Sequence, residues 1–397
     1  MSVIREKLNN LFHPGSGKIP PHLTGREQEQ NYFHKCLNQL LEKTSPDQDM
    51  IIYGPRGNGK TALLRYLKRQ ALEMTNGRVD IAWTTPRKAN SLEGLVSIIT
   101  GSDKNILKRL KGLGVSVNFG VASFNAEFDV PRATGVIEEI LQEKSSKSPF
   151  ILIMDEAHTL TPKMAGILLD AGQNLRGEDC PFFLILAGTP NLEKILNLAS
   201  ATFWDKSNVF PLGRLTAREA KFALTIPLKS CQITCAEESA EEVAYRAHNY
   251  PYFLQIWGDC IASQLLETGS NELTMEIISG AEHIAINRCT TIYTLRYNEL
   301  SELGLIPLAT DIAKTFKKTE DQYIPVQQFE KLIDQSLTER GLPVNQEIIR
   351  KNIQQLSDIG YIWKIDVTNG MKDEIPLLCY EPGIPSLMKF IRRQSRP

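Results

Sequence analysis

The sequence predicts an α/β fold with a doubly wound parallel sheet, followed by a helical domain and a C-terminal winged-helix domain. Two segments, 150–154 and 182–187, are unbroken apolar runs, which is typical of central parallel strands covered on both faces. Segments with helical periodicity lie before, between and after these runs. A chain in which strands alternate with helices in this way forms a sheet with helices on both faces.

The α/β core is expected over residues 23–212. An N-terminal arm precedes it at 1–22, because this segment is rich in proline and glycine towards its end. The first two strands of the core are expected at 50–53 and 79–84, where short apolar segments alternate with predicted helices.

An insertion is expected within the core at about 113–130. Apolar and polar residues alternate there, and the parity of the alternation changes at Ala122 and Ser123. Two strands joined by a turn fit this pattern, so we predict a β-hairpin. The hairpin either contacts a substrate or a neighbouring subunit, or packs as an element at the edge of the domain.

The second half of the chain is mostly helical. We expect a helical domain over 213–298 and a separate unit of three helices and two strands over 299–397. Three helices followed by a two-stranded hairpin are the layout of a winged helix-turn-helix. The predicted elements are helices at 216–225, 237–247, 252–266, 274–298, 302–316, 325–338 and 345–358, and strands at 361–366 and 375–380.

The composition excludes several classes of protein. Of the 397 residues, 42% are hydrophobic and 23% are charged, so packed domains can form. The 45 basic and 46 acidic residues give a net charge of −1, which excludes a basic coat over the whole chain for nucleic acid or membranes. No apolar stretch is long enough to cross a bilayer. The seven cysteines lack zinc-ligand spacing, so we expect free thiols and a cytoplasmic protein.

A glycine-rich segment follows the strand at 50–53 and fits the pattern G-x-x-x-x-G-K-[ST] of a phosphate-binding loop. Glycines allow backbone N–H groups to surround phosphates, and the N-terminus of the following helix adds a favourable dipole. Lys60 is expected to neutralise the β- and γ-phosphates, and Thr61 to give an oxygen ligand to Mg²⁺. The predicted nucleotide-binding residues of this segment are Gly54, Pro55, Arg56, Gly57, Asn58, Gly59, Lys60, Thr61 and Ala62.

Two acidic residues follow the apolar strand at 150–154. Ligands lie at the carboxyl ends of parallel strands, so Asp155 is expected beside the phosphate loop, where it holds Mg²⁺ mostly through water. Glu156 is placed to orient and polarise an attacking water. His158 has two interpretations, a packing or surface histidine and a phosphate sensor.

Polar residues also follow the strand at 182–187. Thr189 and Asn191 are the candidates for a side chain that contacts the γ-phosphate and holds the attacking water, with Thr189 favoured. A simple turn after the strand is the alternative. With Lys60 and Glu156, these two residues form the predicted catalytic set.

Taken together, these motifs resemble those of an AAA+ ATPase, with Walker A, Walker B, a sensor threonine and a helical lid. The segment Leu23–Glu29 resembles the GRExE box of the origin-recognition and STAND branches, and this implies that Arg26 lies against the adenine. The segment 248–255 resembles the GxP element of STAND proteins, and this implies that Pro251 lies over the base and ribose. Ala187–Pro190 is also similar to ATPases of the TniB and ExeA type.

Two arginines typical of AAA+ rings are missing from their usual places. No arginine lies between Asn191 and Gly213, where an arginine finger is expected, and Arg176 and Arg214 are the substitutes available nearby. The sensor-2 arginine at the start of a lid helix is also absent. Slow hydrolysis is therefore expected, which suits a switch better than a processive motor.

The C-terminal domain carries no net charge. Residues 291–397 contain 14 basic and 14 acidic residues, and the expected recognition helix is also balanced. Because phosphate contacts dominate the affinity for DNA, these numbers favour a protein partner over DNA.

The sequence therefore predicts an ATPase that binds ATP and Mg²⁺ and acts as a molecular switch of the AAA+/STAND kind. The switch is expected to control self-association or the activation of a protein partner, and a microbial defence system is one hypothesis for its setting. The alternative is a DNA-bound regulatory ATPase of the transposition or initiation type. A scaffold that binds ATP without hydrolysing it is disfavoured by the presence of Glu156.

Overall fold

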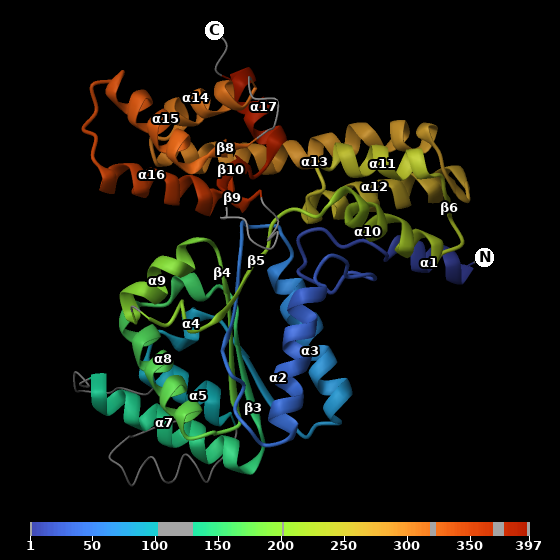
Figure 1. The fold of residues 1–397 in the computed structure, drawn as a ribbon. Coiled ribbons are helices and arrows are strands. Elements are labelled where there is room, and N and C mark those ends of the chain that lie inside the picture. Colours follow the sequence, from blue (N-terminus) through green and yellow to red (C-terminus); the bar gives the residue numbers. More distant parts are fainter. Residues whose placement is uncertain (1, 102–129, 201, 318–322, 368–376, 395–397) are drawn as a thin grey trace. The chain divides into compact units, whose positions relative to one another are not determined.

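The computed structural model describes residues 2–101, 130–200, 202–317, 323–367 and 377–394 (Figure 1). The predicted hairpin at 113–130 lies outside the described residues except for its last residue, Val130, which begins a helix. The chain divides into two compact units. The first consists of Met1–Gly25, Pro55–Gly59 and Leu212–Pro397, and the second of Arg26–Gly54 and Lys60–Pro211.

The second unit contains a five-stranded sheet in the order β2-β3-β4-β1-β5, and every neighbouring pair of strands is parallel. The predicted doubly wound α/β fold is confirmed. The short fifth strand was not predicted, because its sequence, Asn-Val-Phe-Pro, has no apolar run. The strands are β1 (Met50–Tyr53), β2 (Asp80–Thr84), β3 (Phe150–Met154), β4 (Phe182–Gly188) and β5 (Asn208–Pro211).

Helices cover both faces of this sheet (Figure 1). The helices α2 (Glu27–Leu41) and α3 (Lys60–Thr75) lie on one face. Among the described residues, four helices cover the other face, and a short helix and a 3₁₀ turn connect strands to helices. These elements are α4 (Pro86–Ala89), α5 (Leu92–Thr100), α7 (Val130–Lys147), η1 (Ala157–Thr159), α8 (Pro162–Gly177) and α9 (Asn191–Ala199).

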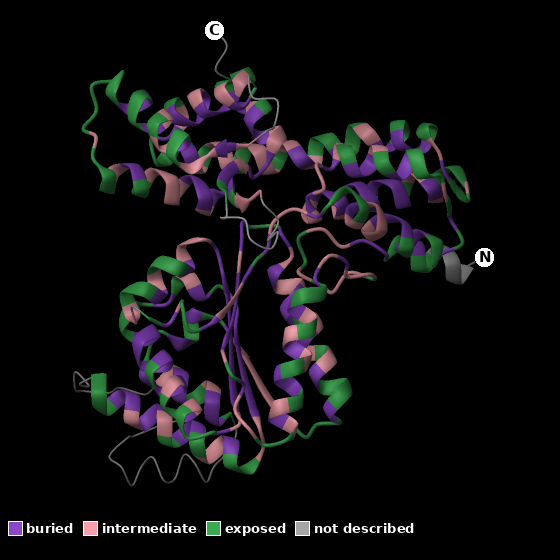
Figure 2. Ribbon diagram, viewed as in Figure 1, coloured by how far each residue is buried: buried purple, intermediate pink, exposed green. Residues whose placement is uncertain are grey.

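The central strands are buried along their whole length, as Figure 2 shows. Successive side chains of a strand point to opposite faces, so Leu152 and Leu184 pack into the core beneath α5, α7, α8 and α9. On the opposite face, the ring of Phe183 lies 6.4 Å from the ring of Phe33 in α2. This double burial explains why β3 and β4 contain no polar residue.

A buried ion pair fixes the start of β1 within the second unit. Asp49 pairs with Arg176 at the end of α8 and accepts a hydrogen bond from the amide of Leu184 at 3.2 Å. Burial raises the pKa of Asp49, and the guanidinium of Arg176 opposes this shift. Arg176 therefore has a structural partner inside its own unit, which argues against its use as a substitute arginine finger.

In the first unit, the predicted helical domain contains α10 (Ala217–Lys229), α11 (Glu237–Arg246), α12 (Pro251–Thr268) and α13 (Met275–Glu302). A helix that was not predicted, α1 (Ser2–Asn9), packs on α12, where Phe12 lies against Gly258. Two short parallel strands, β6 (Thr234–Cys235) and β7 (Glu272–Leu273), link the loops of this domain.

The C-terminal part of the first unit follows the predicted order of elements. It contains α14 (Ile306–Phe316), α15 (Val326–Thr338), α16 (Gln346–Ile359), β9 (Ile362–Asp366) and β10 (Leu378–Pro382), together with the unpredicted β8 (Ile324–Pro325) and α17 (Pro385–Gln394). The three strands form an antiparallel sheet in the order β8-β10-β9. The assignment of this part as a winged helix-turn-helix stays a prediction.

One apolar core runs through the whole first unit, from Leu8 in α1 to Ile391 in α17. The long helix α13 connects its two parts, because Tyr293 packs on Phe253 of α12 and on Phe390 of α17. All seven cysteines are free. Among the described residues, no helix is both long and apolar enough to span a bilayer.

Candidate functional site

The predicted site residues of the second unit lie at one edge of its sheet. Because β1 is next to β4 and β4 is next to β3, the carboxyl ends of these three strands are adjacent. Gly54 follows β1, Asp155 follows β3 and Thr189 follows β4. The parallel register thus brings together residues from three segments that are far apart in the sequence.

The first and last residues of the phosphate loop are held by hydrogen bonds within the second unit. The amide of Gly54 donates to the carbonyl of Gly188 at 3.2 Å, which ties the loop to the end of β4. Lys60 is buried, and its Nζ donates to the carbonyl of Gly54 at 2.7 Å. Gly57 and Gly59 have φ angles of 92° and 86°, a conformation that glycine adopts without strain.

Thr61 and Asp155 form a pair of oxygen donors. The hydroxyl of Thr61 donates to Oδ2 of Asp155 at 2.7 Å, and Oδ1 of Asp155 accepts the amide of Glu156 at 2.9 Å. Burial raises the pKa of Asp155. A hydroxyl and a buried carboxylate fit Mg²⁺, which is held by few protein oxygens and completes its shell with water and phosphate oxygens. Among the described residues, no cluster of three or more His, Cys, Asp or Glu side chains offers an alternative metal site.

Glu156 has a backbone conformation that is rare for a residue with a side chain. Its φ of 57° places it in the left-handed region, at the N-cap of η1. The side chain of Glu156 is 48% exposed, whereas Asp155 is buried. Strained backbone of this kind is concentrated at functional sites. Here the carboxylates of the neighbouring residues Asp155 and Glu156 lie in different environments, the first buried and the second exposed.

The side chain of Thr189 is buried, and its hydroxyl has no hydrogen-bond partner among the described residues. Leaving a buried hydroxyl unsatisfied costs about 1–3 kcal/mol, so such a group calls for a partner. Asn191, the other sensor candidate, is the first residue of α9 and is half-buried.

The centre of the phosphate loop belongs to the first unit and contacts side chains there. Tyr250, which immediately precedes α12, donates its hydroxyl to the carbonyl of Arg56. Burial raises the pKa of Tyr250, so this hydroxyl stays protonated. A Cβ at position 57 would lie 2.9 Å from the Tyr250 ring, so the contact requires Gly57.

Two further contacts hold the loop centre. The guanidinium of Arg56 lies 3.3 Å from Glu299 at the end of α13, and the side-chain amide of Asn58 donates to the carbonyl of Leu212 at 2.9 Å. Sequence reasoning missed Tyr250 and Glu299, because neither belongs to a motif of the phosphate loop. The only signal was the proximity of Tyr250 to Pro251.

The structure places the other predicted residues as follows. Arg26 is buried at the N-cap of α2 in the second unit, Pro251 is the first residue of α12 in the first unit, and Ala62 lies in the first turn of α3. The contacts of Arg26 and Pro251 with a base stay predictions. Arg214, the second substitute for an arginine finger, pairs with Glu381 of β10 within its own unit.

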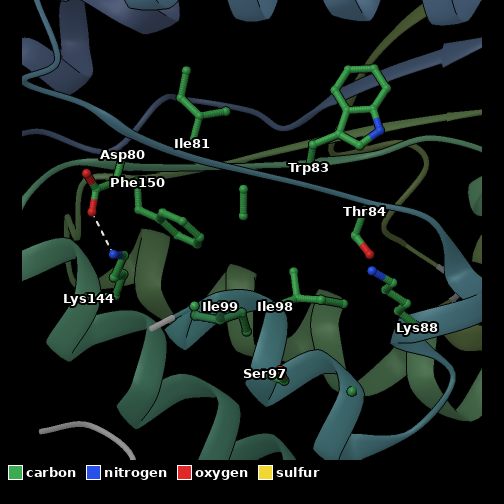
Figure 3. A pocket seen from close by; sticks show the side chains of 13 residues that line it. Asp80, Ile81, Trp83, Thr84, Lys88, Ser97, Ile98, Ile99, Lys144 and Phe150 are labelled. Carbon is green, nitrogen blue, oxygen red and sulfur yellow. Dashed lines mark ion pairs between the residues drawn. The ribbon is translucent and has the colours of Figure 1, made fainter. Parts of the chain in front are cut away.

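A cavity of about 770 Å³ lies along β2, the strand at one edge of the sheet (Figure 3). Its walls include Trp83, Ile98 and Phe150, and the ion pair between Lys144 and Asp80, at 2.6 Å, crosses one part of it. None of the predicted catalytic or nucleotide-binding residues lines this cavity, so we do not assign the active site to it.

The sheet order, the phosphate loop and the acidic strand end define a P-loop fold. A family model described as an AAA domain matches residues 43–196, which lie in the α/β part of the chain. No curated protein matches the chain.

Solved structures are similar to this chain over almost its whole length. A Walker-type ATPase of Pyrococcus abyssi has a TM-score of 0.58 and 15% identity, and the match covers 97% of this chain and 99% of that one. The ORC2 protein of Aeropyrum pernix, solved in ADPNP–ADP complexes, has a TM-score of 0.55 and 14% identity, with coverages of 97% and 99%. At such identities these similarities concern the fold, and they confirm the predicted AAA+ fold. The STAND and TniB/ExeA resemblances stay predictions.

Proposed function

We propose that this protein is a Mg²⁺-dependent ATPase that works as a molecular switch. One observation carries the proposal: the parallel register brings Lys60, the Thr61–Asp155 oxygen pair, Glu156 and the buried hydroxyl of Thr189 to the same edge of the sheet. This set supplies a cation for phosphates, oxygen ligands for a divalent ion, a base and a hydrogen-bond donor.

Each residue has a distinct role in the proposed reaction. Lys60 leaves the carbonyl of Gly54 and neutralises the β- and γ-phosphates, while the amides of the loop bind phosphate oxygens. Glu156, the more exposed carboxylate, orients the attacking water and accepts its proton. The hydroxyl of Thr189 donates to a γ-phosphate oxygen, which satisfies its missing hydrogen bond. Thr61 and Asp155 hold Mg²⁺, which neutralises developing charge on the phosphates.

The switch is proposed because the loop centre contacts residues at the ends of helices in the first unit. Tyr250, Glu299 and the backbone of Leu212 all bond to residues 56–58 within the first unit. A nucleotide that changes the conformation of the loop also changes these bonds, and so acts on the helices that carry the contacts. The balanced charge of residues 291–397 supports a protein partner or a second copy of the chain over DNA.

Light scattering with and without ATP tests the switch, together with phosphate release. We expect Mg²⁺-dependent hydrolysis and a change of mass or partner affinity on binding ATP. The same measurement with duplex DNA at two salt concentrations tests the DNA-bound alternative, because phosphate contacts weaken steeply with salt. Tight, salt-sensitive binding of DNA would overturn the protein-partner proposal, and no binding of ATP would overturn the assignment as an ATPase.

A further inference from the structure

His158 connects two parts of the proposed active site within the second unit. The backbone amide of Thr189 donates to Nδ1 of His158 at 3.2 Å. On the other side of the ring, Nε2 lies 3.5 Å from Oε2 of Glu156. The imidazole, whose side chain is 10% exposed, thus lies between the end of β4 and the proposed base.

The direction of the first hydrogen bond determines the tautomer of the ring. A backbone N–H can only donate, so Nδ1 must carry a lone pair. The proton of the neutral imidazole is then on Nε2, which faces the carboxylate of Glu156. Nδ1 therefore accepts a hydrogen bond from the backbone amide of Thr189, and Nε2–H is directed towards the carboxylate of Glu156.

A glycine makes this arrangement possible. A Cβ at Gly188 would lie 3.2 Å from both Cβ and Nδ1 of His158 and 3.1 Å from its backbone nitrogen. Such contacts are tighter than ordinary van der Waals contacts, so any larger residue at 188 pushes the imidazole away from the strand. The carbonyl of Gly188 also accepts a hydrogen bond from the amide of Gly54. This bond links the strand end beside His158 to the start of the phosphate loop.

We propose that His158 is a positioning residue that couples the γ-phosphate contact at Thr189 to the orientation of Glu156. The coupling rests on the function proposed above. The 3.5 Å separation from Glu156 is longer than a hydrogen bond, so the carboxylate is near the imidazole without being fixed by it. When the Thr189 hydroxyl binds a γ-phosphate, a displacement of its amide moves Nδ1, and Nε2–H moves with it against the carboxylate.

The first test compares His158→Ala with His158→Asn. Asparagine keeps an acceptor near the position of Nδ1 but has no group that reaches Glu156. We expect both variants to lose about 10- to 100-fold in kcat, the effect of misplacing a catalytic group by about 1 Å, with the Kd for ATP changed less than about threefold. A control is His283→Ala, which removes an exposed histidine of α13. Equal kcat in His158→Asn and the parent would overturn the coupling to Glu156.

The second test moves the ring without removing it. Gly188→Ala should reproduce the kcat loss of the histidine variants, whereas Gly135→Ala should not, because a Cβ at Gly135 meets no atom within 4 Å. Parent-like turnover of Gly188→Ala would contradict the proposed placement of the imidazole.

The third test is independent of activity. Nitrogen NMR of the imidazole in the nucleotide-free protein should show an unprotonated Nδ1 and a protonated Nε2 for His158. The signal of Nε2 should shift in Glu156→Gln. The opposite tautomer, or no shift, would overturn the inference while the ATPase assignment stands. Absence of ATP binding by the parent protein would instead overturn the proposed function.

Discussion

The ends and the centre of the phosphate loop are held by different parts of the chain. At the ends, Lys60 bonds to the loop's own backbone and Thr61 to the carboxylate of Asp155, all within the second unit. At the centre, the carbonyl of Arg56 accepts the hydroxyl of Tyr250, within the first unit. Under the proposed function, the ends carry residues that bind phosphate and Mg²⁺, whereas the residues that contact the centre have no chemical role.

In the proposed switch, the loop ends bind and hydrolyse ATP, and the loop centre transmits the binding of ATP to the first unit. The bond from Lys60 to a carbonyl can be exchanged for a bond to phosphate, because both partners are oxygens. Tyr250 bonds to a carbonyl, whereas phosphates are bound by the amides of the loop. Substitutions at the ends should therefore strongly weaken ATP binding or hydrolysis, and substitutions at the centre should mainly alter stability and coupling.

The largest effect on ATP affinity is expected at Lys60. Lys60→Ala removes the ammonium that neutralises the phosphates, and a charge-assisted hydrogen bond contributes about 1.5–3 kcal/mol, so ATP affinity should fall at least about tenfold and up to about 100-fold. Calorimetry measures this loss, with Lys68→Ala on the same helix as the control. Unchanged affinity in Lys60→Ala would remove the basis for assigning the loop to phosphate binding.

Glu156→Gln should separate hydrolysis from binding. The amide cannot accept the proton of the attacking water, so turnover should fall by about 10²- to 10⁴-fold, the typical contribution of a general base. ATP affinity should stay within about threefold of the parent, because the proposed role of Glu156 is to orient water rather than to bind phosphate. If the variant hydrolyses ATP at the parent rate, another residue is the base.

Thr189→Val should lower turnover without lowering stability. Valine keeps the shape of threonine and removes a hydroxyl that has no partner among the described residues. Because an unsatisfied buried hydroxyl is costly, the free energy of unfolding should be unchanged or higher, while kcat falls about tenfold through loss of one hydrogen bond of about 1.5 kcal/mol to the γ-phosphate. Chemical denaturation measures the free energy of unfolding, and phosphate release measures kcat. A destabilised Thr189→Val with normal turnover would indicate a structural threonine instead.

The smallest effect is expected at the loop centre. Tyr250→Phe removes one hydrogen bond to the carbonyl of Arg56, which should cost about 0.5–1.5 kcal/mol of unfolding free energy. The Kd for ATP should change by less than about fivefold, and the ATP-dependent change of mass should weaken. Tyr245→Phe, at a side chain that is mostly exposed, is the control. A loss of ATP binding as large as that of Lys60→Ala would contradict the separation of ends from centre.

The parts of the fold that were predictable are those with strong local patterns. The buried strands β3 and β4 are continuous apolar runs, and the helices α14, α15 and α16 are clearly amphipathic. The strands β5 and β8 are short and contain proline, and their pairing depends on distant strands, so local sequence does not reveal them. The helix α1 was missed because its packing on α12 is a tertiary contact.

The candidate site likewise contains residues that motifs predict and residues that only tertiary contacts reveal. Lys60, Thr61 and Asp155 were predicted from motifs, because the chemistry of binding phosphate and Mg²⁺ fixes both residue type and spacing. Tyr250 contacts a backbone carbonyl, and His158, for which the sequence left two interpretations open, contacts a backbone amide. Such contacts depend on where the chain folds back, and many side chains could make them, so no motif predicts these contacts.

In the proposed reaction, ATP binds at the phosphate loop and is hydrolysed with Glu156 as the base. The most direct test is a single-turnover measurement with radiolabelled ATP and Mg²⁺ on the parent protein, Lys60→Ala and Glu156→Gln. We predict that the parent binds ATP and releases phosphate, that Glu156→Gln binds one intact ATP per chain and retains it, and that Lys60→Ala binds ATP about 10- to 100-fold more weakly and releases no phosphate. Release of phosphate by Glu156→Gln at the parent rate, or binding of ATP by Lys60→Ala with parent affinity, would contradict the claim.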